Sequence, residues 1–148
     1  MKLNLGCCDD ILPGYVNVDI VPPCDQQVDL AGQWPWPDSS VDEIKAHDIF
    51  EHLPDVIHTL NETHRVLRPG GKVEIVVPTT DGRGAWQDPT HCSFFNRNTF
   101  YYFEVGNPHL TRFAPMNGVH SAFKILSSAE RTYPDHVVKL RIVLEAVK

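Results

Sequence analysis

The sequence KLNLGCCDD, which runs from Lys2 to Asp10, decides the fold. Leu3 and Leu5 alternate as the side chains of a buried strand do, and Gly6 permits a tight turn and a close approach to a ligand. A second short apolar stretch, YVNVD, ends at Asp19. A strand, a glycine turn and an acidic residue ending the next strand predict the nucleotide-binding arrangement of doubly wound α/β folds, in which the carboxylate binds ribose hydroxyls.

The connection between these two strands is unusually short. CDDILPG, from Cys8 to Gly14, has seven residues, whereas a parallel crossover usually takes a dozen or more. We therefore expect an extended loop in place of the first helix, which leaves one face of the sheet without its usual cover. Because an uncovered face of a sheet favours association, we predict a homodimer.

Length and composition limit the class of protein. With 148 residues and a net charge of −6, the chain is expected to be a single domain, residues 1–148, without a bare nucleic-acid-binding surface. No apolar stretch approaches the roughly 20 residues of a membrane span, and we expect no signal peptide because an apolar strand pattern starts at Lys2. The four cysteines lack a zinc-binding spacing, so we expect reduced thiols and a cytoplasmic location.

Further strands and one long helix follow in the middle of the chain. We expect a short edge strand over 27–30, a strand over 41–46, and a helix that starts near Asp55 and runs to Arg65 or Leu67. The sequence RPGG at 68–71 is expected to end this helix through a left-handed glycine cap. The apolar stretch KVEIVVP at 72–78 predicts a strand buried on both faces.

The last part of the chain contains a long irregular segment and a hairpin. Residues 79–121 show weak periodicity, and connections of that length usually carry function. A short helix is expected within them, over 96–103. Residues 123–133 and 136–147 predict a terminal antiparallel hairpin around a Pro134–Asp135 turn.

Taken together, five motifs resemble the class I S-adenosylmethionine-dependent methyltransferases, and the stretch DPTHCSFF at 88–95 is similar to their compact bacterial and phage branch. The resemblance implies an α/β fold: a mostly parallel, doubly wound sheet with a C-terminal antiparallel hairpin, minimal helices and no N-terminal helices. The motifs are LNLGCCD at 3–9, VNVDI at 16–20, WPDSSVDEI at 36–44, DIFEHLPD at 48–55 and RVLRPGGKVEIVVP at 65–78.

The same resemblance implies S-adenosylmethionine as the cofactor and assigns its contacts by position. The family commonly has G-x-G in the first loop, and Cys8 stands in place of the second glycine. The implied contacts are Leu5, Gly6 and Cys7 through their backbone to the methionyl part, Asp19 to the ribose, Ile20 to adenine, Asp29 and Leu30 to the adenine edge, and His47 near the sulfonium.

Methyl transfer is an in-line displacement, so the enzyme contributes mainly positioning, and a base is needed only when the acceptor must lose a proton. We predict His91 as that base, oriented by Asp88, because both lie in the long segment that should cover the pocket. Asp81, just past the strand at 72–78, is a candidate substrate contact. The alternatives are a loop histidine bonded to backbone and a turn-forming aspartate.

Asp48, Glu51 and His52 form a D-x-x-E-H sequence that could surround a cation. It is similar to the E-x-x-E-H sequence of the ubiquinone-pathway O-methyltransferases, which use a divalent metal. The E-H pair is also common in members of the superfamily that bind no metal. We therefore expect no metal, and expect Glu51 and His52 to brace the loop under the helix.

Aromatic and basic residues are the remaining candidates for acceptor binding. The aromatic residues either line a planar acceptor site or cover the bare face of the sheet; we favour the second reading, with Trp86 the best candidate for the pocket. Three arginines could bind an anionic acceptor or a phosphate. The aromatic residues are Trp34, Trp36, Trp86, Phe94, Phe95, Phe100, Tyr101 and Tyr102, and the arginines are Arg83, Arg97 and Arg112.

These observations predict an enzyme that transfers a methyl group from S-adenosylmethionine to a small-molecule acceptor, in keeping with the acidic charge and the covered pocket. Methylation of RNA is the first alternative, because missing helices leave an open site and the arginines could contact phosphates. A non-catalytic binding module is the second alternative, and Cys8 in the glycine loop is its support.

Overall fold

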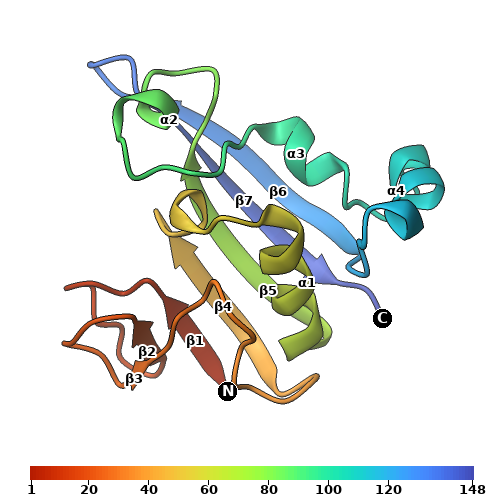
Figure 1. Cartoon of the computed structure of the whole chain (residues 1–148), viewed down its shortest axis with the longest axis horizontal. Helices are drawn as coiled ribbons and strands as arrows, with labels where there is room; N and C mark the ends of the chain where they lie inside the picture. The colour runs from red at the N-terminus through yellow and green to blue at the C-terminus, as the bar shows by residue number, and fades with distance from the viewer.

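The computed structural model describes residues 1–148 and contains one seven-stranded sheet in the order β3-β2-β1-β4-β5-β7-β6 (Figure 1). The pairs among β1 to β5 are parallel, and β7 runs antiparallel to both β5 and β6. The predicted fold class is therefore confirmed. The strands are β1 (Lys2–Leu5), β2 (Val16–Asp19), β3 (Gln26–Gln27), β4 (Val41–His47), β5 (Leu67–Pro78), β6 (Phe123–Thr132) and β7 (Val138–Ala146).

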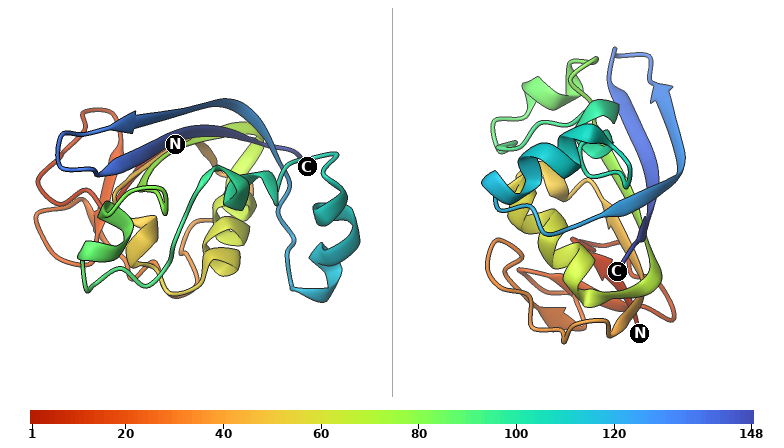
Figure 2. Two further views of the ribbon diagram at one scale, coloured as in Figure 1. Left: turned by 90° about the horizontal axis from the view of Figure 1, so that it is seen from above. Right: turned by 90° about the vertical axis from the view of Figure 1, so that its right-hand side faces the viewer.

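The helices are short, and all of them lie on one side of the sheet (Figure 2). No helix has the length and apolar character needed to cross a bilayer. The expected short helix after 96 and the terminal hairpin are both present. The helical segments are η1 (Phe50–His52), α1 (Val56–Val66), α2 (Gly84–Gln87), α3 (Arg97–Tyr101), α4 (Pro108–Phe113) and η2 (Ala114–Met116).

The crossover from β1 to β2 is an extended loop, as predicted, and two buried asparagines hold it against the sheet. The Asn4 side-chain amide donates to the Asp10 carbonyl at 2.7 Å and to the Asn17 side-chain oxygen at 3.0 Å. The same Asn17 oxygen accepts the Leu12 amide at 2.8 Å, and the Asn17 side-chain nitrogen donates to Asp25 at 2.9 Å. Polar side chains therefore occupy the place where a crossover helix would pack.

The rest of the face without helices is charged. His47 on β4 pairs with Glu74 on β5 at 2.8 Å, and Glu74 also pairs with Arg141 on β7. Lys2 on β1 pairs with Glu43 on β4 at 2.7 Å. The homodimer was predicted from an exposed apolar face, and the structure removes that reason because charged side chains are compatible with solvent.

Two expectations about β5 are wrong. Its central residues alternate, with Val73, Ile75 and Val77 fully buried and Glu74 half-buried, because only one face of the sheet carries a core. Helix α1 ends at Val66 and continues directly into the strand, so no glycine cap ends it. The glycines instead lie where the pairing register between β4 and β5 shifts, and Gly70 has a φ of +74° there.

The edge strand and the start of α1 lie closer to their predicted positions. The strand expected over 27–30 is shorter and earlier, at Gln26–Gln27, where it pairs with β2. Asp55 is the N-cap of α1, and its carboxylate accepts the His58 amide at 2.9 Å.

Four of the eight candidate aromatic residues are buried in the core under the helices and two are exposed, so the prediction that most of them cover the bare face is wrong; the buried ones are Trp34, Trp36, Phe95 and Phe100, and the exposed ones are Trp86 and Phe94. Trp34, Phe50, Phe95 and Phe100 are all buried in one cluster with the inward-facing strand residues. The loop that carries Trp34 is fixed to α1, because Glu62 accepts its backbone amide at 2.8 Å. The core is therefore one-sided, and it lies on the face that carries the helices.

Replacing Asn17 with leucine tests whether the asparagine pair substitutes for the missing helix. The part-buried Leu12 amide and the buried Asn4 side-chain amide would both lose this acceptor, so we expect the free energy of unfolding to fall by about 2–4 kcal/mol. Asn98→Leu is the control, because that side chain is exposed, and its effect should stay within about 0.5 kcal/mol. Equal urea denaturation midpoints for the two variants would contradict this role.

Candidate functional site

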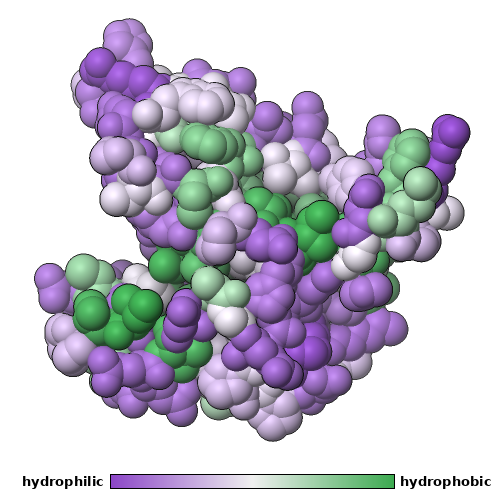
Figure 3. Space-filling view, viewed as in Figure 1, coloured by the Kyte–Doolittle hydropathy of each residue, from purple (hydrophilic) through white to green (hydrophobic).

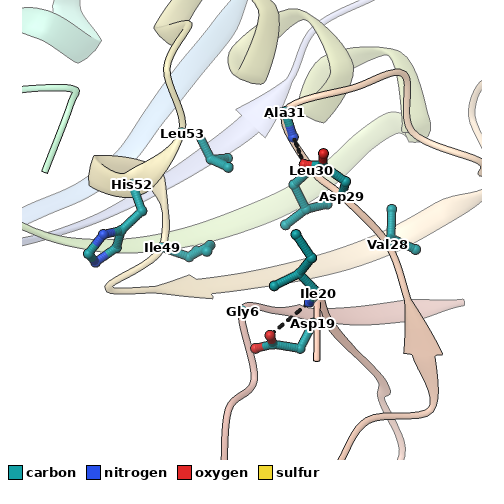
Figure 4. Close-up of a pocket in the computed structure, with 10 residues that line it drawn as sticks. All are labelled: Gly6, Asp19, Ile20, Val28, Asp29, Leu30, Ala31, Ile49, His52 and Leu53. Carbon is teal, nitrogen blue, oxygen red and sulfur yellow. Dashed lines mark hydrogen bonds between the residues drawn. The ribbon is translucent and has the colours of Figure 1, made fainter. Parts of the chain in front are cut away.

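The first pocket lies beyond the carboxyl ends of β1 and β2, against the segment that follows β4 (Figure 4). It encloses about 200 Å³, and most of its wall is apolar. The surface is hollowed between the part that carries β1 to β3 and the part that carries α2, and hydrophobic residues gather on the first part (Figure 3). The lining residues are Gly6, Asp19, Ile20, Val28, Asp29, Leu30, Ala31, Ile49, His52 and Leu53.

Gly6 shapes this pocket through its backbone. Its φ is +66°, which side chains rarely permit, and a Cβ built at this position would lie 2.6 Å from the Cβ of Ile49. Ile49 itself lines the pocket. The glycine therefore allows the first loop to pack against the segment after β4, which brings two walls of the pocket together.

Asp19 and Asp29 supply the carboxylates of the pocket. The Ile20 amide donates to Asp19 Oδ1 at 2.7 Å, and the Cys8 amide donates to Asp19 Oδ2 at 2.9 Å. Asp29 Oδ1 accepts the Ala31 amide at 2.9 Å. Cys8 has a φ of +44°, so the residue in place of the second family glycine takes the left-handed conformation that glycine favours.

This combination fits a nucleoside. Apolar side chains on both sides of a narrow slot suit the faces of a planar base, while carboxylates at the rim accept hydrogen bonds from hydroxyl groups. The Asp19 carboxylate is fixed in place by backbone amides before any ligand arrives.

A second pocket of about 240 Å³ adjoins the first, and His52 lines both. Its wall is mostly polar, with three carboxyl groups and one ammonium group. The lining residues are Asp48, Glu51, His52, Pro78, Gly84, Gln87, Asp88, His91, Val137 and Lys139.

Hydrogen bonds orient the two histidines of the second pocket. His91 Nδ1 lies 3.1 Å from the Ala85 carbonyl, so this nitrogen carries the proton and donates it. The Thr90 hydroxyl donates to Asp88 Oδ1 at 2.7 Å, so its oxygen accepts a hydrogen bond from His52 Nδ1 at 3.1 Å. In both imidazoles Nε2 is left with a free lone pair. The two rings lie edge to face with centroids 4.8 Å apart.

Glu51 is the buried acid of the second pocket. Only 2% of its surface is exposed, and its Oε2 atom has no hydrogen-bond partner. Burial raises the pKa of this carboxyl to about 7. The Glu51 backbone carbonyl accepts hydrogen bonds from the amides of Cys92 and Ser93 at 2.9 and 3.0 Å. The main chain of Glu51, and not its side chain, therefore holds the loop after α2 in place.

The comparisons with known proteins agree with this geometry. A family model described as a methyltransferase domain matches residues 15–75. Over 56 residues, the chain is 38% identical to 27-O-demethylrifamycin SV methyltransferase from Amycolatopsis mediterranei, a match that covers 35% of this chain and 21% of that protein. The chain thus spans about a fifth of the length of this curated relative.

Solved structures show the same fold. The structure of 1,6-didemethyltoxoflavin-N1-methyltransferase from Burkholderia thailandensis, with bound 1,6-didemethyltoxoflavin and S-adenosylhomocysteine, superimposes with a TM-score of 0.65 at 16% identity, covering 99% of this chain and 71% of that one. A methyltransferase from Archaeoglobus fulgidus described as SAM-dependent gives a TM-score of 0.65 at 14% identity, covering 97% and 85%. The chain therefore has the fold of the class I methyltransferases.

Several of the implied cofactor contacts do line the first pocket: Gly6, Asp19, Ile20, Asp29 and Leu30. Leu5 and Cys7 are buried outside it, and the Cys7 amide is already bonded to the Val18 carbonyl at 3.0 Å. The prediction for His47 is wrong, because its side chain pairs with Glu74 on the charged face of the sheet. Ile49, two residues later, occupies the expected place at the pocket.

Two of the three predicted catalytic residues line a pocket, and the third does not. His91 and Asp88 both line the second pocket, but His91 Nε2 lies 3.7 Å from Asp88 Oδ2, beyond a hydrogen bond, and the Ala85 carbonyl orients the ring instead. Hydrogen bonds from the side chain and the backbone of Thr90 lower the pKa of the Asp88 carboxyl. Asp81 is exposed in a turn and lines neither pocket.

The residues proposed for acceptor recognition lie outside both pockets. Trp86 is 60% exposed and stacks on Phe94 with ring centroids 4.6 Å apart. Arg83 donates to the Asp135 carbonyl in the β6–β7 turn, and Arg112 lies over Phe113. The sequence analysis did not identify Val28, Ala31, Ile49 and Leu53, which line the first pocket. It singled out the E-H pair that contains His52, but it did not predict that His52 lies between the two pockets.

Glu51→Gln should change how stability depends on pH. The folded chain keeps the Glu51 proton up to about pH 7, whereas the unfolded chain releases it near the ordinary value of 4.5. The protonated group therefore stabilises the fold below about pH 4.5, and this contribution is lost as pH rises through about 7. The total loss in the free energy of unfolding is on the order of 3 kcal/mol.

The measurement is urea denaturation of both proteins from pH 4.5 to 8 in buffers that contain a chelator. Relative to wild type, the glutamine variant should become progressively more stable as pH rises, because all other groups titrate alike in the two proteins. Parallel stability curves would contradict a buried carboxyl with a raised pKa.

Proposed function

We propose that this domain transfers a methyl group from S-adenosylmethionine to a small polar acceptor molecule, with the cofactor in the first pocket and the acceptor in the second. The observation that carries the proposal is that the two pockets adjoin and share His52. The fold supports it, and so do relatives whose names specify 27-O-demethylrifamycin SV and 1,6-didemethyltoxoflavin as substrates.

The first pocket would bind the cofactor through a small number of residues. Asp19 and Asp29 would accept hydrogen bonds from its hydroxyl and amino groups, and Ile20 and Leu30 would contact the adenine ring. When bound, S-adenosylmethionine supplies an electrophilic methyl group on a sulfonium centre. The apolar side chains of the pocket would cover part of the bound cofactor from water.

The second pocket would position the acceptor and take up its proton. His91 donates through Nδ1 to a backbone carbonyl, so the lone pair on Nε2 is free to accept a proton from an acceptor hydroxyl or amine. The polar wall favours an acceptor with several hydrogen-bonding groups. His91 is therefore the proposed base.

Charge distribution favours a small acceptor over RNA. Arg83 donates to the Asp135 carbonyl and Arg112 lies over its neighbour Phe113, and none of the three candidate arginines, Arg97 included, lines the second pocket. That pocket carries more carboxyl groups than cationic groups, which would repel a phosphate backbone.

The proposed function is tested by calorimetric titration of S-adenosylmethionine and S-adenosylhomocysteine into the wild-type protein, Asp19→Ala and Asp81→Ala. We expect micromolar binding to wild type, at least a tenfold loss in Asp19→Ala because a charged hydrogen bond disappears, and no change in Asp81→Ala, whose side chain is exposed outside both pockets. Wild-type protein that binds neither ligand would overturn the proposal.

Radiolabelled S-adenosylmethionine then separates the acceptor classes. Incubation with polar aromatic metabolites and with total RNA should label only the small molecules, and labelling of RNA alone would refute the small-molecule assignment.

A further inference from the structure

Three metal-binding side chains converge on the second pocket from two segments of the chain. Glu51 and His52 come from η1, and His91 comes from the loop after α2. One ligand atom from each lies within 4.8 Å of the other two. All three residues line the same cavity, so a group bound between them would be accessible from it.

The Glu51 carboxyl is the first sign that this cluster binds a ligand. A buried carboxyl oxygen normally has a hydrogen-bond partner, because burying an unpaired polar atom costs stability. Glu51 is 2% exposed, and its Oε2 has no partner among the residues of the chain. No basic side chain pairs with it, since Lys139, the ammonium group of the pocket, is paired with Asp48.

The two histidines give an independent sign. A histidine that binds a metal through one ring nitrogen typically donates a proton from the other to a carbonyl, hydroxyl or carboxylate, which fixes its tautomer. His91 donates from Nδ1 to the Ala85 carbonyl, and His52 donates from Nδ1 to the Thr90 hydroxyl. Each ring therefore presents an unprotonated Nε2, the form that binds a cation.

We propose that Glu51, His52 and His91 bind a divalent transition-metal ion such as Zn²⁺, Mn²⁺ or Co²⁺. Two imidazoles and one carboxylate suit these ions better than Ca²⁺ or Mg²⁺, which prefer oxygen ligands. Ligands of one such ion lie roughly 3–3.5 Å apart, so small side-chain rotations close the cluster around it. The remaining coordination positions face the second pocket.

This ligand set differs from the D-x-x-E-H reading of the sequence. Asp48 is engaged with Lys139, and His91, forty residues after Glu51, takes its place. If the second pocket holds the acceptor, the bound ion would replace His91 as the group that promotes loss of the acceptor's proton, because His91 Nε2 would be a ligand and no longer a base. The ion would bind an acceptor oxygen or nitrogen and lower its pKa. That consequence rests on the proposed function, whereas the cation site does not.

The test uses the full chain without an affinity tag, stripped of metal with a chelator and titrated calorimetrically with Zn²⁺, Mn²⁺ and Co²⁺. We expect one ion per chain for at least one of these metals, a visible absorption band on adding Co²⁺, and at least a tenfold loss of affinity in both Glu51→Gln and His91→Ala. Circular dichroism confirms that each variant is folded, and the near-isosteric Glu51→Gln keeps the test valid if His91→Ala unfolds.

His47→Ala is the matched control, because that histidine pairs with Glu74 on the opposite face of the sheet and should leave metal affinity within twofold of wild type. Absence of stoichiometric binding, or an equal loss in His47→Ala and Glu51→Gln, would overturn the site. Titrating S-adenosylhomocysteine into the same samples keeps the two proposals apart: metal binding without cofactor binding contradicts the proposed function alone, and the reverse contradicts the metal site alone.

Discussion

The ten residues between β1 and β2 must carry the chain from the end of one strand to the start of its parallel neighbour. They cannot contain a helix that spans the sheet, so Asn4 and Asn17 hold an extended loop against the strands instead. Without helices on that face, the outward side chains are charged and paired with one another, and the apolar core forms on the other face alone.

This one-sided arrangement also places the functional segments. Since the helices all lie on the face with the core (Figure 2), η1 and the loop after α2 meet above the ends of the parallel strands. The Glu51 carbonyl accepts two amides from that loop, and this contact brings His91 toward His52. The nucleoside-type pocket and the polar pocket therefore share a wall, which a methyl donor and its acceptor require.

Local patterns in the sequence were enough to predict Gly6, Asp19 and the terminal hairpin, because each depends on residues near it in the chain. The direction of His47 follows from strand alternation, since Ala46 is buried and its neighbour must face the other way. The role of Gly70 was misjudged because a helix cap and a strand irregularity both use a glycine with positive φ. Glu51 and His91 come together only through folding, across forty residues that contain α1 and β5, so their meeting could not be read from sequence.

The central claim is that the pocket containing Asp19 and Asp29 binds the cofactor beside a separate acceptor pocket, with His52 between them. A crystal structure of the chain with S-adenosylhomocysteine tests it most directly. The account predicts ligand density in contact with both carboxylates, ending at His52, with the cavity lined by Glu51 and His91 still open. Density on the charged face of the sheet, or filling the cavity around Glu51 and His91, would contradict it.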